Sequence, residues 1–236
     1  MATTTTRAPT RDAQEGRALP PASAPGAPHR RRRGPRLGSG GAILEAATRL
    51  FLEKGYRGTS MDEIAAAAGV SKQTIYTHFA NKQELFARLV LGNAERVDAF
   101  VAELPSVVHD ADDLAGGLDA LARRYLRFVI RPEVLRLRRL VIGEASRFPE
   151  LAQAYFEAVP VRVYLALSGL FADLAHEGRL RVADPVLAAQ HFAWLVLGGP
   201  LDRGMFVVGD TALQDDDIDR LAREGVRVFL AAYAAA

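Results

Sequence analysis

The polar side chains best suited to binding chemistry lie in a short stretch near the front of the chain, between Gly58 and Lys82. Successive residues of a helix are about 100° apart, so a helix from about Lys72 to Phe79 gathers an ammonium, an amide, a phenol and a hydroxyl on one side. Such groups suit the phosphate oxygens and base edges of a DNA major groove. An ordinary solvated helix surface has the same pattern, so this face alone leaves both interpretations open. The face consists of Lys72, Gln73, Tyr76 and Thr77.

Helix end signals divide this stretch into the elements that must position that face. A serine followed three residues later by a glutamate has the spacing of a capping box, which begins one helix. A glycine then ends that helix, and a second serine caps the next one. Two short helices separated by about three residues with a glycine between them predict a helix-turn-helix. The signals are Ser60 with Glu63, Gly69, Ser71, and Asn81 with Glu84, which begin a third helix.

The run from Gly41 to Leu85 resembles the DNA-binding domain of the TetR/AcrR family of one-component regulators. The resemblance rests on ILEAATRLFLEKGYRGTS, DEIAAAAGVS and KQTIYTHFANKQEL, roughly 45 residues of the chain. The positions that fall where the family pattern has them include Tyr76, His78, Phe79, Asn81, Lys82 and Leu85. The resemblance implies phosphate contacts from Ser60, Tyr76, His78 and Lys82. It places Lys72, Gln73, Thr74 and Thr77 nearest the bases.

Charge is distributed unevenly along the chain, although the net charge is only +2. Residues 1–37 hold eight arginines against Asp12 and Glu15, so the remainder carries 22 basic and 26 acidic residues. Residues 1–38 are rich in Pro, Ala, Thr and Arg, and we expect them to be disordered. Their basic block would add affinity for DNA phosphates independent of sequence, although a solvated tail without a role is the alternative. The block consists of Arg30, Arg31, Arg32, Arg33 and Arg36.

The remaining chain predicts helices throughout, so the fold class is all-α: a helix-turn-helix domain over 39–84 and a helical regulatory domain over 85–236. No sustained alternating strand pattern appears. A long helix from Lys82 to Leu104 would link the two domains mechanically. We expect Ser39 to cap the first helix, and Pro160 to kink or split the longest one. The expected helices are Gly41–Lys54, Asp112–Val129, Pro132–Ser146, Pro149–Glu177, Asp184–Val208 and Asp215–Tyr233, besides those above.

The second half resembles the C-terminal regulatory domain of AefR-like members of the same family. The residues that carry this likeness are LRRLVIGEASRFPELAQAYFE and LAHEGRLRVADPVLAAQHFAWLVLGG. It implies a helical domain that dimerises and holds a ligand. The last two helices would pair across the dimer as a four-helix interface. The last helix offers an apolar stripe for it, although a helix packed in its own core has the same pattern. The stripe consists of Ile218, Leu221, Val226, Phe229, Leu230 and Tyr233.

Other clusters carry little chemistry. Asp173 and His176 have the spacing of one di-iron half-site, but such a site needs two pairs and two further carboxylates, so a surface pair is favoured. No Gly-x-Ser-x-Gly elbow and no cysteine occur, and Gly38–Gly41 lacks the context of a phosphate loop. We therefore expect no catalytic residues, metal or cofactor. The effector site stays unknown, with Arg139, Glu144, Ser146 and His191 as polar candidates if they are buried.

These features predict a cytoplasmic, homodimeric transcriptional regulator without membrane contact. It would bind a palindromic operator in double-stranded DNA through two reading helices. The expected activity is repression released by a small-molecule effector. A helical ligand carrier or enzyme that retains a helix-turn-helix-like front is the alternative, and a regulator working mainly through protein contacts is another. DNA affinity discriminates the first interpretation from the others.

Overall fold

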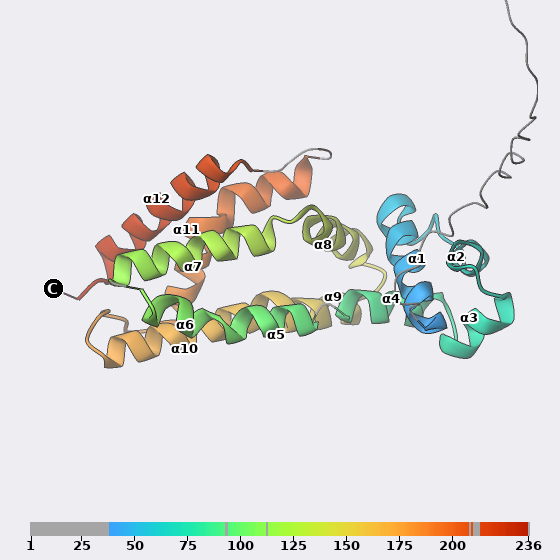
Figure 1. Cartoon of the computed structure of the whole chain (residues 1–236), viewed down its shortest axis with the longest axis horizontal. Coiled ribbons are helices and arrows are strands. Elements are labelled where there is room, and N and C mark those ends of the chain that lie inside the picture. The colour runs from blue at the N-terminus through green and yellow to red at the C-terminus, as the bar shows by residue number, and fades with distance from the viewer. Residues whose placement is uncertain (1–37, 93, 112, 208, 210–212, 236) are drawn as a thin grey trace, which may run out of the picture. The chain divides into compact units, whose positions relative to one another are not determined.

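The fold is helical, as the sequence predicts. The computed structural model describes residues 38–92, 94–111, 113–207, 209 and 213–235, and within these the only extended pairing is an isolated bridge between Leu180 and Ala234. Figure 1 shows the arrangement. The helices are α1 Ser39–Lys54, α2 Met61–Ala68, α3 Lys72–His78, α4 Lys82–Leu91, α5 Ala94–Ala102, α6 Leu104–His109, α7 Leu114–Val129, α8 Pro132–Glu144, α9 Pro149–Phe156, the π-helical turn η1 Glu157–Val161, α10 Arg162–His176, α11 Pro185–Phe206 and α12 Asp215–Tyr233.

The end of α1, both ends of α2 and the start of α3 lie at the predicted signals. Gly55 ends α1 at φ 73°, a backbone conformation that glycine adopts without strain. Ser60 and Glu63 form both bonds of the capping box that begins α2. Gly69 closes α2 in the left-handed conformation, and the Ser71 side chain accepts a bond from the Thr74 amide at the start of α3. Local capping therefore fixes the angle between α2 and α3.

The cap of α4 differs from the expected pattern in one bond. Asn81 Oδ1 accepts a bond from the Glu84 amide at 2.9 Å, as predicted. The Glu84 carboxylate, however, accepts from the Ala80 amide at 2.8 Å. Glu84 thus reaches one residue further back than in a capping box and holds the turn between α3 and α4.

The predicted long helix from Lys82 to Leu104 is wrong, because the chain breaks into three shorter helices. α4 ends at Leu91, where the Gly92 amide donates to the Arg88 carbonyl. α5 follows, and α6 begins at Leu104 with Pro105 in its first turn, where a missing N–H leaves no bond unmade. The predicted long helix is therefore interrupted at Gly92.

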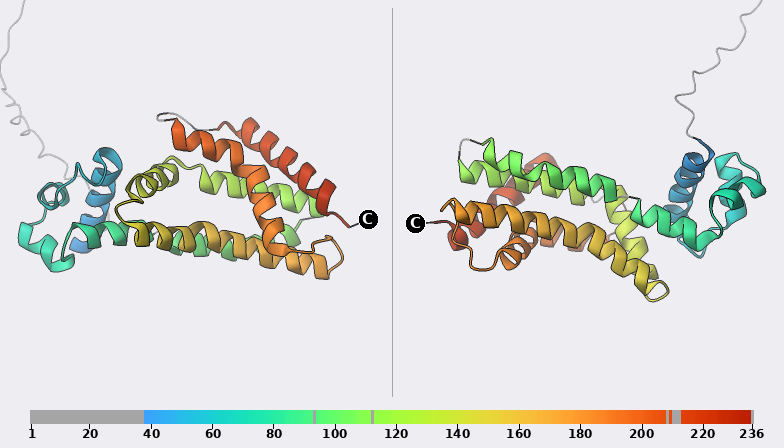
Figure 2. Two further views of the ribbon diagram at one scale, coloured as in Figure 1. Left: turned by 180° about the vertical axis from the view of Figure 1, so that it is seen from behind. Right: turned by 90° about the horizontal axis from the view of Figure 1, so that it is seen from below.

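Pro160 splits the longest predicted helix without ending it. The backbone passes through η1, a π-helical turn that contains Pro160, and continues from α9 into α10 (Figure 2). A π-helical turn inserts an extra residue and so relieves the missing proline hydrogen bond. By length and composition Pro149–His176 could cross a membrane. Its α10 portion instead packs an apolar face into the protein core, with Val163, Leu167, Leu170, Phe171 and Leu174 buried.

Two hydrophobic cores form, and the helical regulatory residues contribute to both. The larger core joins α5, α6 and α7 with α10, α11 and α12. The smaller core fills the helix-turn-helix unit, yet it also takes Leu137, Val141 and Tyr155 from α8 and α9. The regulatory helices therefore pack directly against the DNA-binding helices.

The apolar stripe of α12 faces the interior, so the prediction that it forms the dimer interface is wrong. Ile218, Val226 and Phe229 are buried in the larger core, and the other three stripe residues pack against that core. The reason is the contact of α12 with both α7 and α11 of its own chain, which leaves Leu221, Leu230 and Tyr233 half-buried.

Candidate nucleic-acid interface

Helix α3 has the two faces that the sequence predicts. Ile75 is 0% exposed and Phe79 is buried, and both belong to the smaller core with Ile64, Ala65, Ala68 and Val70. On the opposite face Tyr76 is 44% exposed. Lys72, Gln73, Thr77 and His78 are exposed as well, whereas Thr74 is half-buried. The core thus fixes the helix and leaves its polar groups facing outward.

The ammonium of Lys72 is held by a neighbour that a nucleic acid could replace. Lys72 Nζ lies 2.9 Å from a carboxylate oxygen of Asp62 on α2. This hydrogen bond and charge raise the pKa of Lys72. Both side chains are exposed, so solvent and salt screen this ion pair and it contributes little to stability. A phosphate oxygen can therefore take over the ammonium at little cost.

His78 joins the end of α3 to the start of α1. Its Nε2 lies 2.6 Å from Ser39 Oγ. Ser39 is the first residue of α1, and the N-cap is Gly38, which makes no side-chain bond, so the prediction that Ser39 caps this helix is wrong. The hydroxyl instead faces His78, which keeps its other ring nitrogen for a further contact.

Lys82 has an unpredicted role inside the unit. Its Nζ donates to the Tyr56 carbonyl at 2.8 Å and to the Thr59 carbonyl at 2.7 Å, and it lies 4.3 Å from the centre of the Tyr56 ring. Burial, and then the nearby charge of Arg147, lower the pKa of Lys82. Two of the three ammonium hydrogens thus hold the turn between α1 and α2, and one remains. The distance of Thr59 along the chain hides this bond from sequence patterns.

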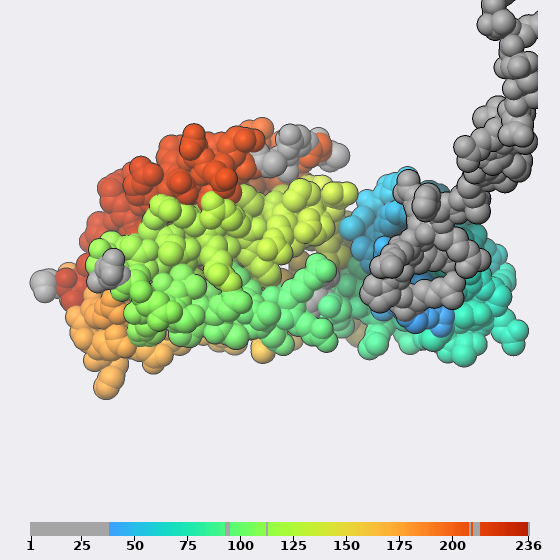
Figure 3. Space-filling view, in the orientation of Figure 1, coloured from blue at the N-terminus to red at the C-terminus, as the bar shows by residue number. Residues whose placement is uncertain are grey.

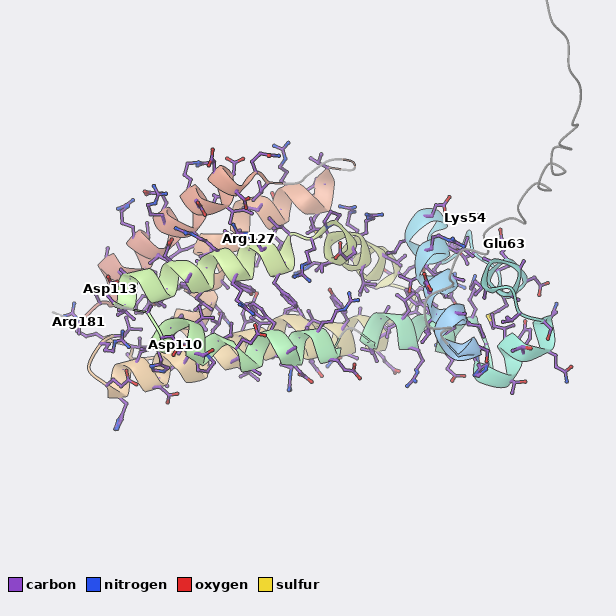
Figure 4. The ribbon with its side chains drawn as sticks, in the orientation of Figure 1. Lys54, Glu63, Asp110, Asp113, Arg127 and Arg181 are labelled. Carbon is purple, nitrogen blue, oxygen red and sulfur yellow. The ribbon has the colours of Figure 1, made fainter. Side chains whose placement is uncertain are left out.

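The Ser60 cap is tied into a small network at the same surface. The Glu63 carboxylate accepts from the Ser60 amide and hydroxyl, each at 2.9 Å, and pairs with Lys54 Nζ at 3.0 Å. Figure 4 labels Lys54 and Glu63, where α1 ends beside the start of α2. The hydrogen bond from Lys54, followed by the bond from the Ser60 amide, lowers the pKa of Glu63 to about 2. Sequence reasoning found Ser60 and Glu63 but missed Lys54.

Comparison with known proteins matches two segments of the chain to one family. Residues 43–89 match the family described as bacterial regulatory proteins, tetR family. Residues 116–235, about half of the chain, match the family described as the C-terminal domain of AefR-like transcriptional repressors. The chain belongs to the TetR family. It is a DNA-binding transcriptional regulator with a helical regulatory domain.

Individual relatives agree with this assignment. The repressor AcnR from Corynebacterium diphtheriae is 30% identical over 188 residues, which cover 78% of this chain and 90% of AcnR. A TetR-family regulator from Mesorhizobium loti has a solved structure with a TM-score of 0.77 and 38% identity, covering 84% of this chain and 97% of that one. The Flavonoid-responsive Regulator FrrA follows, with a TM-score of 0.67 and 32% identity over 83% of this chain and 97% of that chain. The match to the activator FasR from Mycolicibacterium smegmatis spans only 39% of FasR.

The polar effector candidates of this TetR-family regulator do not gather at one place. Arg139 donates to the Gly204 carbonyl and so joins α8 to α11. His191 Nδ1 lies 2.7 Å from Tyr233 Oη on α12. Glu144 is half-buried at the end of α8, and Ser146 is exposed. These positions serve helix packing or face solvent.

Metal ligands do not assemble within the part of the chain that the structure describes, where no group of three or more His, Cys, Asp or Glu residues could hold an ion. Asp173 and His176 are both exposed on α10. The basic block from Arg30 to Arg36 lies outside the described residues.

The structure of this TetR-family regulator contains a cavity whose position the sequence does not predict. It measures about 280 Å³ and lies where α1 meets α4, α5, α8 and α9. Figure 3 shows the surface hollowed between the green of α5 and the yellow-green of α8. The lining is Leu44, Thr48, Leu52, Leu89, Gly92, Arg96, Val97, Phe128, Arg131, Glu133, Val134, Leu137, Tyr155 and Val159.

Proposed function

We propose that this regulator is a repressor that binds a palindromic operator as a homodimer and leaves it when a small molecule binds the helical domain. The observation that carries the proposal is the exposed polar face of α3, fixed from behind by buried Ile75 and Phe79. A short helix held in this way can enter a major groove without rearranging. It acts in the cytoplasm, where its operator is accessible, and we assign no catalytic role to it.

The contacts divide into base reading and phosphate binding. Gln73 and Thr77 are exposed on the reading face beside Lys72, and Thr74 stands at its edge. We assign these four residues to the bases. The phosphate contacts come from Ser60, Tyr76, His78 and Lys82, the last through its remaining ammonium hydrogen. The arm Arg30–Arg36 would add phosphate contacts independent of sequence.

The dimer surface that the structure supports lies on the outer face of α11. Four large apolar side chains are exposed there, and Val228 of α12 is exposed as well. Such a cluster on a water-soluble surface marks a protein contact. Pairing this face with a second copy would present two reading helices to half-sites about one helical turn apart. These four residues of α11 are Val186, Leu187, Trp194 and Leu195, and Phe206 at the end of the helix is exposed as well.

Release by a ligand fits the names of two relatives. FrrA is named for its response to flavonoids, and AcnR is named as a repressor. A ligand lowers operator affinity only as far as it prefers the conformation that does not bind DNA. Helix α8 contacts α1 and helix α9 contacts α4 directly, and α4 ends just before Gly92. Through these contacts a conformational change in the helical domain would move the DNA-binding helices.

Fluorescence anisotropy with labelled duplexes from upstream of the chain's own gene tests the proposal. At a stated salt concentration the protein should prefer one upstream duplex over scrambled DNA, and Tyr76→Ala should weaken binding to it. The control Tyr164→Phe changes a tyrosine of α10 remote from α3 and should bind as the wild type does. Equal affinity for every duplex would refute DNA reading and favour a carrier or enzyme that keeps the helix-turn-helix front.

A further inference from the structure

The cavity is bounded on one side by a helix of the DNA-binding unit. Leu44, Thr48 and Leu52 recur at every fourth residue of α1, so they share one face of that helix. The buried residues of α1, among them Ala47 and Phe51, belong to the smaller core, and Leu44 and Leu52 pack at the edge of that core. One face of α1 therefore packs on α2 and α3 and another lines the cavity. A molecule in the cavity would touch the helix on which α2 and α3 pack.

The inner wall of the cavity is apolar. Leu89, Val97 and Leu137 line it from α4, α5 and α8, and Tyr155 closes it from α9. Burial raises the pKa of the Tyr155 phenol above its ordinary value of 10.0. A wall of this kind favours a hydrocarbon or aryl group over a charged one.

The mouth of the cavity carries two arginines without a carboxylate partner. Arg96 and Arg131 line both the cavity and an adjoining groove between α5 and α7. In the part of the chain that the structure describes, neither guanidinium group has an ion pair or a hydrogen bond, and that of Arg131 lies over the Phe128 ring. Glu133 is the one carboxylate among the cavity-lining residues. The mouth therefore has a surplus positive charge.

The neighbouring arginines of the groove differ from this pair. Arg123 pairs with Asp119 and Asp219, Arg124 with Glu103, and Arg127 with Asp215. Their charges are thus already compensated within the chain. Arg96 and Arg131 are the cations of this surface whose guanidinium donors are available to an incoming anion, and Arg recognises carboxylates and phosphates through paired donors.

The volume of the cavity limits the size of the part of a ligand that can be buried in it. A water molecule occupies about 30 Å³ in the liquid, so a cavity of about 280 Å³ holds roughly nine non-hydrogen atoms. The adjoining groove measures about 880 Å³ and can accept a larger polar group outside.

We infer that this cavity binds an amphipathic organic anion, whose apolar chain lies among α1, α4, α8 and α9 and whose acidic group meets Arg96 and Arg131. The inference rests on the proposed function, since it names the chemical class and the site of the effector. It also places the ligand against Leu44 and Leu52, so that occupancy acts on α1 directly.

Three probes with one chain and different charge test the site: octanoate, octylamine and 1-octanol, titrated by calorimetry into the full-length protein without DNA. Octanoate should bind at least tenfold more tightly than octanol, and octylamine should bind most weakly. Arg96→Gln combined with Arg131→Gln should lower octanoate affinity at least tenfold and leave octanol affinity unchanged. The control Arg136→Gln alters an exposed arginine of α8 that lines neither cavity nor groove, and it should bind octanoate as the wild type does.

A second variant checks the location independently of charge. Val134→Trp fills the cavity and should abolish binding of all three probes, with its thermal unfolding measured to confirm folding. Equal affinity for the three probes, or octanoate binding that survives the double arginine variant, would overturn the inference. Should Val134→Trp fail to fold, the arginine variants alone decide.

Operator release is measured separately, by anisotropy of the labelled duplex with octanoate added. Octanoate that binds through Arg96 and Arg131 and leaves operator affinity unchanged would refute release through this site, while the site itself would stand. Release by another compound that is indifferent to both arginine variants would refute the site and leave the proposed function intact.

Discussion

The DNA-reading surface, which is the exposed polar face of α3 with its supporting residues, and the cavity are formed in opposite ways. The reading surface comes from one continuous stretch, Gly58–Lys82, whose helices begin and end through bonds between residues three or four apart. The cavity draws its lining from helices α1, α4, α5, α7, α8 and α9, with residues from Leu44 to Val159. Local bonds thus make the DNA-binding surface, whereas only the packing of distant helices makes the cavity.

This difference separates a surface that stays constant from one that can vary. The caps fix the ends of α2 and α3 through bonds within the DNA-binding unit itself. The cavity changes with any shift of α8 or α9 against α1. The two regions meet in the smaller core, where the ring of Tyr56 lies 4.9 Å from the ring of Phe86 and 4.9 Å from that of Phe148. Movement of the regulatory helices therefore reaches the DNA-binding unit through shared aromatic contacts.

The largest effect is expected where the two regions share a core. Phe86→Ala removes a side chain that is 1% exposed and contacts Phe51, Tyr56 and Phe148. The lost burial and the resulting hole should lower the free energy of unfolding by about 3–5 kcal/mol. Denaturant titration measures it, and Phe206→Ala, at a residue 80% exposed, is the control. A loss below about 1 kcal/mol would show that the regions do not depend on this ring.

The next effect separates a neutral base contact from a charged one. Gln73→Ala should cost about 1–3 kcal/mol of operator affinity and leave binding to scrambled DNA unchanged. Lys72→Ala should also lower operator affinity, and because it removes the ammonium that now pairs with Asp62 it should flatten the salt dependence, which Gln73→Ala should not. Anisotropy at several salt concentrations distinguishes the two. Gln153→Ala, at an exposed residue of α9, is the matched control.

The helices that form the reading surface can be predicted from the sequence, because the residues that begin and end them interact with close neighbours in the chain. Ser60, Glu63, Gly69 and Ser71 each act within four residues, and the structure confirms every one of these signals. Period and capping also predicted α12 from Asp215 to Tyr233 without error. The assignment of individual DNA contacts stays a prediction.

The sequence predictions are wrong where the structure depends on contacts between residues far apart in the chain. The stripe of α12 looks the same in sequence whether it meets a second copy or, as here, α7 and α11 of its own chain. The apolar period after Lys82 continues through Gly92 and so predicts one helix, whereas α4 ends at Leu91. Arg96 and Arg131 are ordinary arginines in sequence, and only the pairing of their neighbours sets them apart.

A smaller effect tests whether the caps stand alone. Ser60→Ala removes the acceptor for the Glu63 amide and should cost about 1 kcal/mol of stability. Because the cap is local, the loss should be the same in the presence and absence of a cavity-filling substitution such as Val134→Trp. Ser146→Ala, at an exposed serine, is the control. Strong non-additivity in this double-mutant cycle would show that the cap depends on the cavity helices after all.

The smallest effect concerns the charge of Glu63 in acid. Its folded pKa of about 2 lies below the ordinary value of 4.5, mainly because of the bond from Lys54. The stability it contributes is therefore present above pH 4.5 and is lost as the pH falls from about 4.5 toward 2. Glu63→Gln should flatten this part of the curve of unfolding free energy against pH, whereas Glu53→Gln, at an exposed residue of α1, should not. If both variants follow the wild-type curve, the charge of Glu63 does not support the cap, and the fixed geometry of α2 must come from the hydroxyl of Ser60 and the packing of Ile64.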